Sequence, residues 1–156
     1  MAEQGARSVV EAFVRALEAK DFETQGQLVT DDYVDEIPQS GERIRGRGNA
    51  RAVVENYPGG VGTIDTAHSK VVGAEDRWVM TPSLSVLRIE GSGDTFTYTG
   101  LLRYPATGEV WHIIAIVKVR DGRVAKTTTF YAPPFEAPAW RAPFVEQYQP
   151  LQQATD

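Results

Sequence analysis

Apolar residues recur every three or four positions in the first part of the chain, which is the spacing of amphipathic α-helices. They predict a helix from about residue 4 to 20 and a second from about 22 to 30, on the positions Val9, Val10, Phe13, Leu17, Phe22 and Leu28. Asp21 is a suitable N-cap for the second helix. A third helix is predicted from about 47 to 57, because Pro58-Gly59-Gly60 would end it.

The remaining pattern is typical of β-strands. One strand is predicted at about 33–37, between the second and third helices. Beyond residue 60 an antiparallel meander is predicted, with strands near 64–73, 77–90, 94–105, 109–120 and 123–131. Asp121-Gly122 is a strong hairpin signal, and Pro82 indicates a bulge or an edge position in its strand.

Residues 109–120 are apolar on both faces of the predicted strand. One face carries Trp111, Ile113, Ala115, Val117 and Val119, and the other carries Val110, Ile114 and Ile116. Helices can cover only one of these faces, so we expect a second subunit to cover the other. The sequence therefore predicts a homodimer through the outer sheet face.

The C-terminal part differs in composition from the rest. We expect one domain over residues 1–132 and an extension over 133–156 that is rich in proline and aromatic residues. Trp140, Phe144 and Tyr148 are spaced by four residues, which predicts a short helix. This helix is expected to pack on the domain or, nearly as well, on the dimer partner.

Composition and charge exclude several classes of protein. The chain has 156 residues, a net charge of −5 and scattered basic residues, which argues against binding of nucleic acid. No apolar run approaches the roughly 18 residues of a membrane helix. The chain has no cysteine, and neither of its two histidines has ligand spacing with acidic residues, so no metal site is expected. The cytoplasm is the expected location.

Two adjacent carboxylates, Asp35 and Glu36, lie in the strand before Pro38 and are the strongest catalytic candidates. Neighbouring side chains of a strand point to opposite faces, so only one of the two can enter a cavity on one face. A carboxylate in an apolar pocket has a raised pKa and suits general acid/base catalysis near neutral pH.

The order of these elements resembles the nuclear transport factor two-like cone, and within it the SnoaL-like group. The resemblance covers roughly residues 5–132 and rests on the segment Val-Arg-Ala-Leu-Glu-Ala-Lys-Asp-Phe, on Glu36-Ile37-Pro38 with Gly46, and on Val-Arg-Asp-Gly-Arg-Val at 119–124. It implies an α+β fold: a cone-shaped curled antiparallel sheet with the three N-terminal helices packed in its concave face. The short C-terminal helix is additional.

Two well-known catalytic sets of this fold are not matched. The resemblance to ketosteroid isomerase places its base, tyrosine and second acid at Ile37, Phe13 and Ala115. The resemblance to limonene epoxide hydrolase places Glu36 at an asparagine position and Thr129 at an aspartate position. The pattern of SnoaL-type polyketide cyclases is loose enough for Asp35 or Glu36 to serve. Glu36 is slightly preferred as the inward carboxylate, although the isomerase comparison favours Asp35.

The same resemblance implies a pocket with aromatic and hydroxyl side chains and few charges. Its expected substrate-binding residues are Tyr98, Trp111, Ile113, Ala115, Thr127, Thr129, Tyr131, Ile37 and Phe13. We therefore expect an enzyme of the cyclase, isomerase, dehydratase or hydrolase kind that acts on an apolar, polyketide- or terpenoid-like molecule without a cofactor. The alternative is a non-catalytic module for binding a hydrophobic ligand or for dimerisation.

Overall fold

The structure is a computed structural model that describes residues 2–60, 65–72 and 93–148. The helices are α1 (Ala2–Glu18), α2 (Phe22–Leu28) and α3 (Gly46–Glu55), and a short 3-10 helix spans Ala139–Phe144. The strands are β1 (Val29–Ile37), β2 (Glu42–Arg45), β3 (Asp65–Val72), β4 (Thr95–Tyr104), β5 (Glu109–Arg120) and β6 (Arg123–Ala132).

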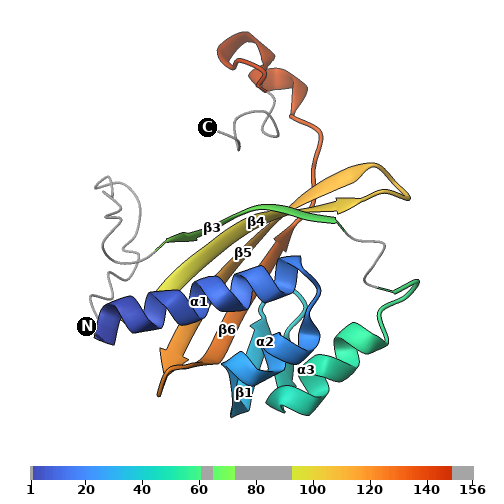
Figure 1. Cartoon of the computed structure of the whole chain (residues 1–156). Coiled ribbons are helices and arrows are strands. Elements are labelled where there is room, and N and C mark those ends of the chain that lie inside the picture. The colour runs from blue at the N-terminus through green and yellow to red at the C-terminus, as the bar shows by residue number, and fades with distance from the viewer. Residues whose placement is uncertain (1, 61–64, 73–92, 149–156) are drawn as a thin grey trace.

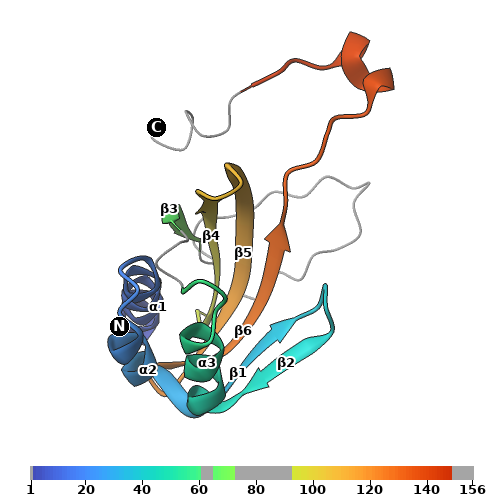
Figure 2. The same cartoon turned by 90° about the vertical axis from the view of Figure 1, so that its right-hand side faces the viewer.

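The six strands form one curled sheet in the order β2-β1-β6-β5-β4-β3. All neighbours are antiparallel except β1 and β6, which are parallel. Helices α1, α2 and α3 lie on one side of the sheet, inside its curvature (Figures 1 and 2). The fold is the α+β cone that the sequence predicts.

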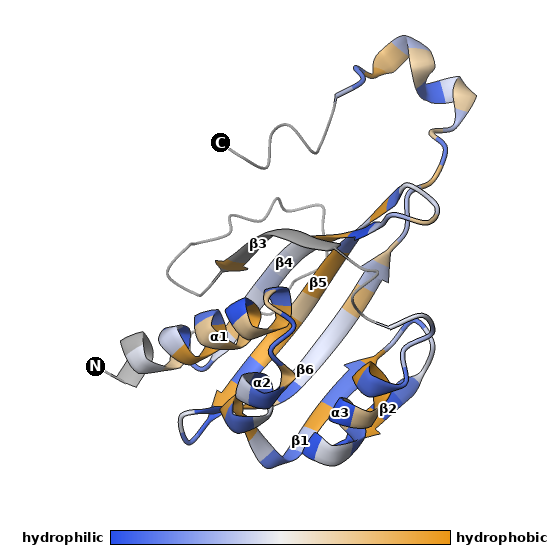
Figure 3. Cartoon of the chain, turned by 45° about the vertical axis from the view of Figure 1, so that its right-hand side comes forward, coloured by the Kyte–Doolittle hydropathy of each residue, from blue (hydrophilic) through white to orange (hydrophobic). Residues whose placement is uncertain are grey.

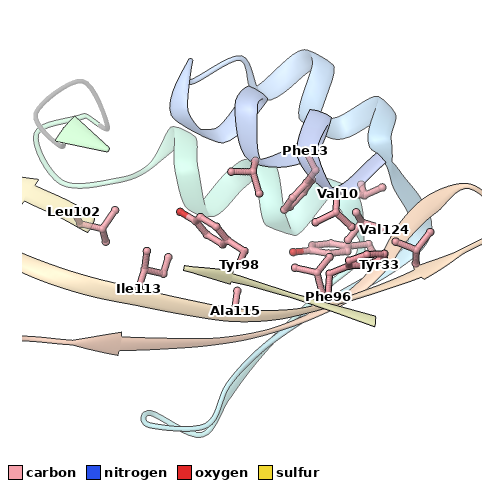
Figure 4. Packing of buried hydrophobic residues seen from close by; sticks show 13 residues of the cluster. Val10, Phe13, Tyr33, Phe96, Tyr98, Leu102, Ile113, Ala115 and Val124 are labelled. Carbon is pink, nitrogen blue, oxygen red and sulfur yellow. The ribbon is translucent and has the colours of Figure 1, made fainter. Parts of the chain in front are cut away.

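The core lies between α1 and the inner face of the sheet. Val10 and Phe13 of α1 are almost fully buried and face Phe96 and Tyr98 of β4 (Figure 4). Burying one such large side chain contributes about 1.5–3 kcal/mol. The apolar face of the first predicted helix therefore fixes α1 against the sheet.

The two-sided pattern of residues 109–120 is confirmed in β5. Ile113, Ala115, Val117 and Val119 are buried, whereas Ile114 and Ile116 on the opposite face are 41% and 44% exposed. The outer face of the sheet therefore carries apolar side chains that nothing in the described chain covers. The ribbon of β5 has mostly hydrophobic colour in Figure 3.

Strand β1 begins earlier than predicted, at Val29 instead of about residue 33. Asp31 and Asp32 lie in this added part of the strand, and both carboxylates are exposed and form ion pairs. Asp31 pairs with Arg47 at 2.5 Å and Asp32 pairs with Arg120. Neutralised in this way, the acidic residues fit into the strand. The expected strand near 77–90, with Pro82, lies outside the described residues.

The C-terminal extension leaves the end of β6 and runs away from the sheet (Figure 2). Its helix is a 3-10 helix that ends at Phe144, so the expected stripe through Tyr148 does not form; Pro143 lies inside the helix and cannot donate a backbone hydrogen bond. Trp140 and Phe144 are 71% and 82% exposed. Packing of these aromatic residues on their own domain is therefore not observed, and packing on a partner stays a prediction.

Candidate active site

Strand β1 places its alternate residues on two different faces of the sheet. Tyr33, Asp35 and Ile37 line the cavity between the sheet and the helices. Glu36 points to the other face, where Lys126 and Arg43 each approach one of its carboxylate oxygens to 2.8 Å. The preference for Glu36 as the inward carboxylate is therefore wrong. The positive charges of Lys126 and Arg43 on the outer face hold it there.

Asp35 is held by hydroxyl groups of the neighbouring strand β6. In the parallel register Asp35 lies opposite Thr127. The hydroxyls of Thr127 and Thr129 both donate to Oδ1 of Asp35, at 2.7 and 2.9 Å. The second carboxylate oxygen, Oδ2, has no hydrogen-bond partner in the described part of the chain, so it is available to a ligand in the cavity.

A buried tyrosine extends this arrangement. The hydroxyl oxygens of Tyr33 and Thr127 are 2.7 Å apart. Because the single hydroxyl proton of Thr127 goes to Asp35, Tyr33 must donate to Thr127. Tyr33, Thr127 and Asp35 thus form one directed chain of hydrogen bonds toward the ionised carboxylate.

The environment of Asp35 raises the pKa of its carboxyl group above the ordinary value of 3.8. Burial is the largest cause, because it disfavours the charged form, and the negative charge of Glu36 adds to it. The hydrogen bonds from Thr127 and Thr129 act in the opposite direction and lower the pKa of Asp35. By contrast, the hydrogen bonds and positive charges of Lys126 and Arg43 lower the pKa of Glu36.

The cavity has two adjacent parts whose walls share residues. The inner part, of about 480 Å³, contains Asp35. The outer part, of about 620 Å³, opens beside Trp111 and Tyr104, and Tyr98 and Tyr131 line both parts. These volumes are typical of sites for small organic ligands.

Tyr131 presents an unbonded hydroxyl to this cavity. Its side chain is mostly buried, and among the described residues its hydroxyl has no hydrogen-bond partner. Burial, and then the nearby charge of Asp35, raise the pKa of Tyr131, so it remains a protonated donor at neutral pH. Gln39 holds its backbone: the Tyr131 N–H donates to Oε1 of Gln39 at 2.5 Å, and Nε2 of Gln39 donates to the Tyr131 carbonyl at 2.7 Å.

The structure brings together most residues that the sequence selects. The walls of the inner part include Phe13, Ile37, Tyr98, Ile113, Ala115, Thr127, Thr129 and Tyr131 with Asp35. Trp111 lines the outer part only. Sequence reasoning missed Tyr33, although it lies two residues before Asp35 and so on the same face of β1. It also missed Gln39, whose role depends on a contact 92 residues along the chain.

Neither a metal centre nor a membrane span is found within the described ranges. No group of three or more acidic or histidine side chains there has the arrangement of a metal site. No helix there is long and apolar enough to cross a bilayer. His68 and His112, the two histidines of the chain, lie on different strands.

Comparisons with known proteins agree with this architecture. The family model described as a SnoaL-like domain matches residues 10–127. A nuclear transport factor two-like protein of unknown function from Burkholderia xenovorans LB400 has 27% sequence identity and a TM-score of 0.66, covering 94% of this chain and 98% of its own. A search of curated proteins finds no significant match.

Two further solved structures share the fold. A protein from Kribbella flavida, provisionally named a ketosteroid isomerase, has 22% identity and a TM-score of 0.68, covering 94% of this chain and 91% of its own. A protein from Xanthomonas campestris, provisionally named a polyketide cyclase, has 18% identity and a TM-score of 0.60, covering 84% and 93%. At such identities the likeness establishes the fold alone.

Proposed function

The chain belongs to the SnoaL-like domain family, and we propose that it is a cofactor-independent enzyme that uses Asp35 as a general base on an apolar small molecule. The proposed reaction removes a proton from a carbon next to a carbonyl group. Such a step begins both isomerisation and ring closure, which correspond to the provisional names of two structural neighbours.

The arrangement of Asp35 is the observation that carries this proposal. Oδ1 is fixed by two threonine hydroxyls, while Oδ2 is left to the cavity. A base needs a defined orientation and a pKa closer to the working pH than that of an exposed carboxylate. Burial of Asp35 raises its pKa and so favours this role.

Tyr131 supplies the complementary group. Removal of the proton by Asp35 places negative charge on the carbonyl oxygen of the substrate, and a hydroxyl donor in the same cavity stabilises that charge. Tyr131 remains protonated at neutral pH because its pKa is raised. The resulting enolate is either reprotonated at another carbon, which is an isomerisation, or attacks a second carbonyl group, which closes a ring. The same base also suits dehydration or activation of water for hydrolysis.

The test follows proton removal directly, with 2-tetralone as a probe ketone in deuterated water. Exchange of its α-protons is measured by NMR with wild-type protein and with Asp35→Asn, Glu36→Gln and Tyr131→Phe. We expect the wild type to accelerate exchange and Asp35→Asn to reduce this acceleration by about 100-fold or more, the usual contribution of a general base. Glu36→Gln is the matched control and should retain the rate, and Tyr131→Phe should show an intermediate loss.

Equal rates for the wild type and Asp35→Asn would exclude this carboxylate as the base. If the wild type bound 2-tetralone without accelerating exchange, the non-catalytic ligand-binding module would be favoured instead. Binding is followed in the same samples by chemical-shift changes of the protein.

A further inference from the structure

Lys20 lies at the mouth of the outer part of the cavity. It follows the last turn of α1, and its side chain lines this space together with Tyr57 after α3 and with Tyr104 and Trp111 of the β4–β5 hairpin. The residue is half-buried. A cation therefore stands at the edge of a wall formed mainly by aromatic rings.

The other charged groups that line the cavity have partners. Glu109 accepts a hydrogen bond from Nε1 of Trp111 at 3.1 Å. In the inner part, Arg51 pairs with Glu23, and Arg47 pairs with Asp31. Asp35 is bound by two threonine hydroxyls. The Lys20 ammonium, by contrast, has neither a hydrogen bond nor an ion pair with any residue in the described part of the chain.

The backbone of Lys20 gives a second, independent observation. Lys20 has a φ of +57°, in the left-handed region. It occupies the position after the end of α1, where the Asp21 N–H bonds the Ala16 carbonyl and the Lys20 N–H bonds the Leu17 carbonyl. Glycine is the residue that this helix ending favours. A lysine at this position therefore adopts a backbone conformation that glycine would adopt more easily.

We propose that Lys20 anchors an anionic group of the ligand, so that the substrate is a planar apolar molecule with a carboxylate or similar anion at one end. The anionic end lies beside Lys20, the apolar body lies against Trp111 and Tyr104, and the opposite end reaches Asp35. The position of the reacting end rests on the proposed function, but the binding of the anion does not.

Two fluorescent probes with the same aromatic framework test this proposal. 1-Anilinonaphthalene-8-sulfonate carries an anionic group, and N-phenyl-1-naphthylamine lacks it. We expect Lys20→Gln to weaken binding of the sulfonate about tenfold or more, because a charge-assisted hydrogen bond is lost. Binding of the neutral probe should remain unchanged. Arg15→Gln, which removes one positive charge from the exposed side of α1, is the matched control and should affect neither probe.

Further measurements locate the probe and separate this proposal from catalysis. The indole N–H signal of Trp111, assigned with Trp111→Phe, should shift when the sulfonate binds to the wild type. Lys20→Gly, which suits the backbone at this position, should reproduce the loss seen with Lys20→Gln. Asp35→Asn should still bind the sulfonate, so failure of the proposed catalysis would leave this result intact.

Three results would overturn the proposal. They are an unchanged affinity for the sulfonate in Lys20→Gln, an equal loss for both probes, or an equal loss in Arg15→Gln.

Discussion

Asp35 and Glu36 are neighbours in sequence and have opposite electrostatic environments. Asp35 faces a cavity in which burial raises its pKa, while Glu36 faces two cations that lower its pKa. The difference comes from strand geometry, because adjacent side chains point to opposite faces. One strand thus carries a carboxylate whose charged form is destabilised and a neighbouring carboxylate whose charged form is stabilised.

This difference predicts opposite effects on stability when each carboxylate is replaced by its amide. Asp35 has a folded-state pKa above its ordinary value of 3.8, so the folded protein loses stability as the pH rises from 3.8 through that higher pKa. Asp35→Asn should therefore gain in melting temperature relative to the wild type as the pH rises to neutral. This gain should shrink as the pH falls toward 3.8.

Glu36 has a folded-state pKa below its ordinary value of 4.5, so its contribution is present above pH 4.5 and is lost at lower pH. Glu36→Gln should accordingly lower the melting temperature at neutral pH, and the difference should fade in acid. Thermal denaturation of the three proteins from about pH 2.5 to about pH 8 measures both trends. Parallel curves at all pH values would show that these environments are not those of the folded protein.

For these two residues, the sequence predicts that the side chains point to opposite faces of the sheet, but it does not predict which one faces the cavity. The pair Asp35-Glu36 shows that one carboxylate faces inward, yet the choice depends on partners distant in the chain. Thr127 binds Asp35 and Lys126 pairs with Glu36, and both belong to β6. Lys126 and Thr127 are adjacent in β6, so their side chains also point to opposite faces of the sheet. Only the register between β1 and β6 shows which of them lies beside which carboxylate.

Among the elements, the turn after β1 has a specific link to the end of β6. Strand β1 ends at Ile37, and the side-chain amide of Gln39 then takes both backbone hydrogen bonds of Tyr131. The amide thus continues the ladder between the two strands beyond the last residue of β1. The link fixes the part of β6 that carries the proposed donor Tyr131.

Removal of this link should loosen the end of β6. Gln39→Ala is expected to destabilise the local structure by about 1 kcal/mol, the usual net contribution of such hydrogen bonds. Hydrogen exchange of the Tyr131 amide, measured by NMR, should become about fivefold faster. Ser40→Ala removes only a 3.3 Å contact to the Ile37 carbonyl in the same turn and is the control. Unchanged exchange in Gln39→Ala would show that the strand holds without the amide.

The elements with the strongest local pattern are those that the sequence predicts best. Strand β5 matches the predicted range 109–120, and the Asp121-Gly122 hairpin has positive φ values at both residues, as its type requires. The aromatic spacing of four predicts a short helix that includes Tyr148, whereas the structure has a 3-10 helix at Ala139–Phe144 with Pro143 inside it. The spacing of aromatic residues along the chain cannot show whether another part of the protein offers a surface on which they can pack.

For the whole molecule, two sets of apolar side chains are exposed in the single chain. Ile114 and Ile116 lie on the outer sheet face, and the extension exposes Phe135, Trp140 and Phe144. The extension starts at the end of β6, and a hollow lined by Ile114, Phe135 and Tyr148 lies between it and the outer face. In a symmetric dimer, the outer sheet face of each subunit could contact that of the other, and each extension could pack on the partner.

We therefore propose a homodimer in which outer sheet faces meet and each extension packs on the partner. Such an interface must bury about 800 Å² on each subunit to be stable. Sedimentation of the intact chain at micromolar concentration should give twice the monomer mass of 17.2 kDa. Ile116→Lys should shift the equilibrium to the monomer because it places a charge in the interface, whereas Val53→Lys on α3 should not.

Truncation after Ala132 should weaken the dimer and leave the melting temperature of the monomeric domain nearly unchanged, since the aromatic residues of the extension are exposed in the single chain. A truncated protein that dimerises as tightly as the intact chain would show that the extension has no part in the interface, and a monomeric intact chain would contradict the dimer itself.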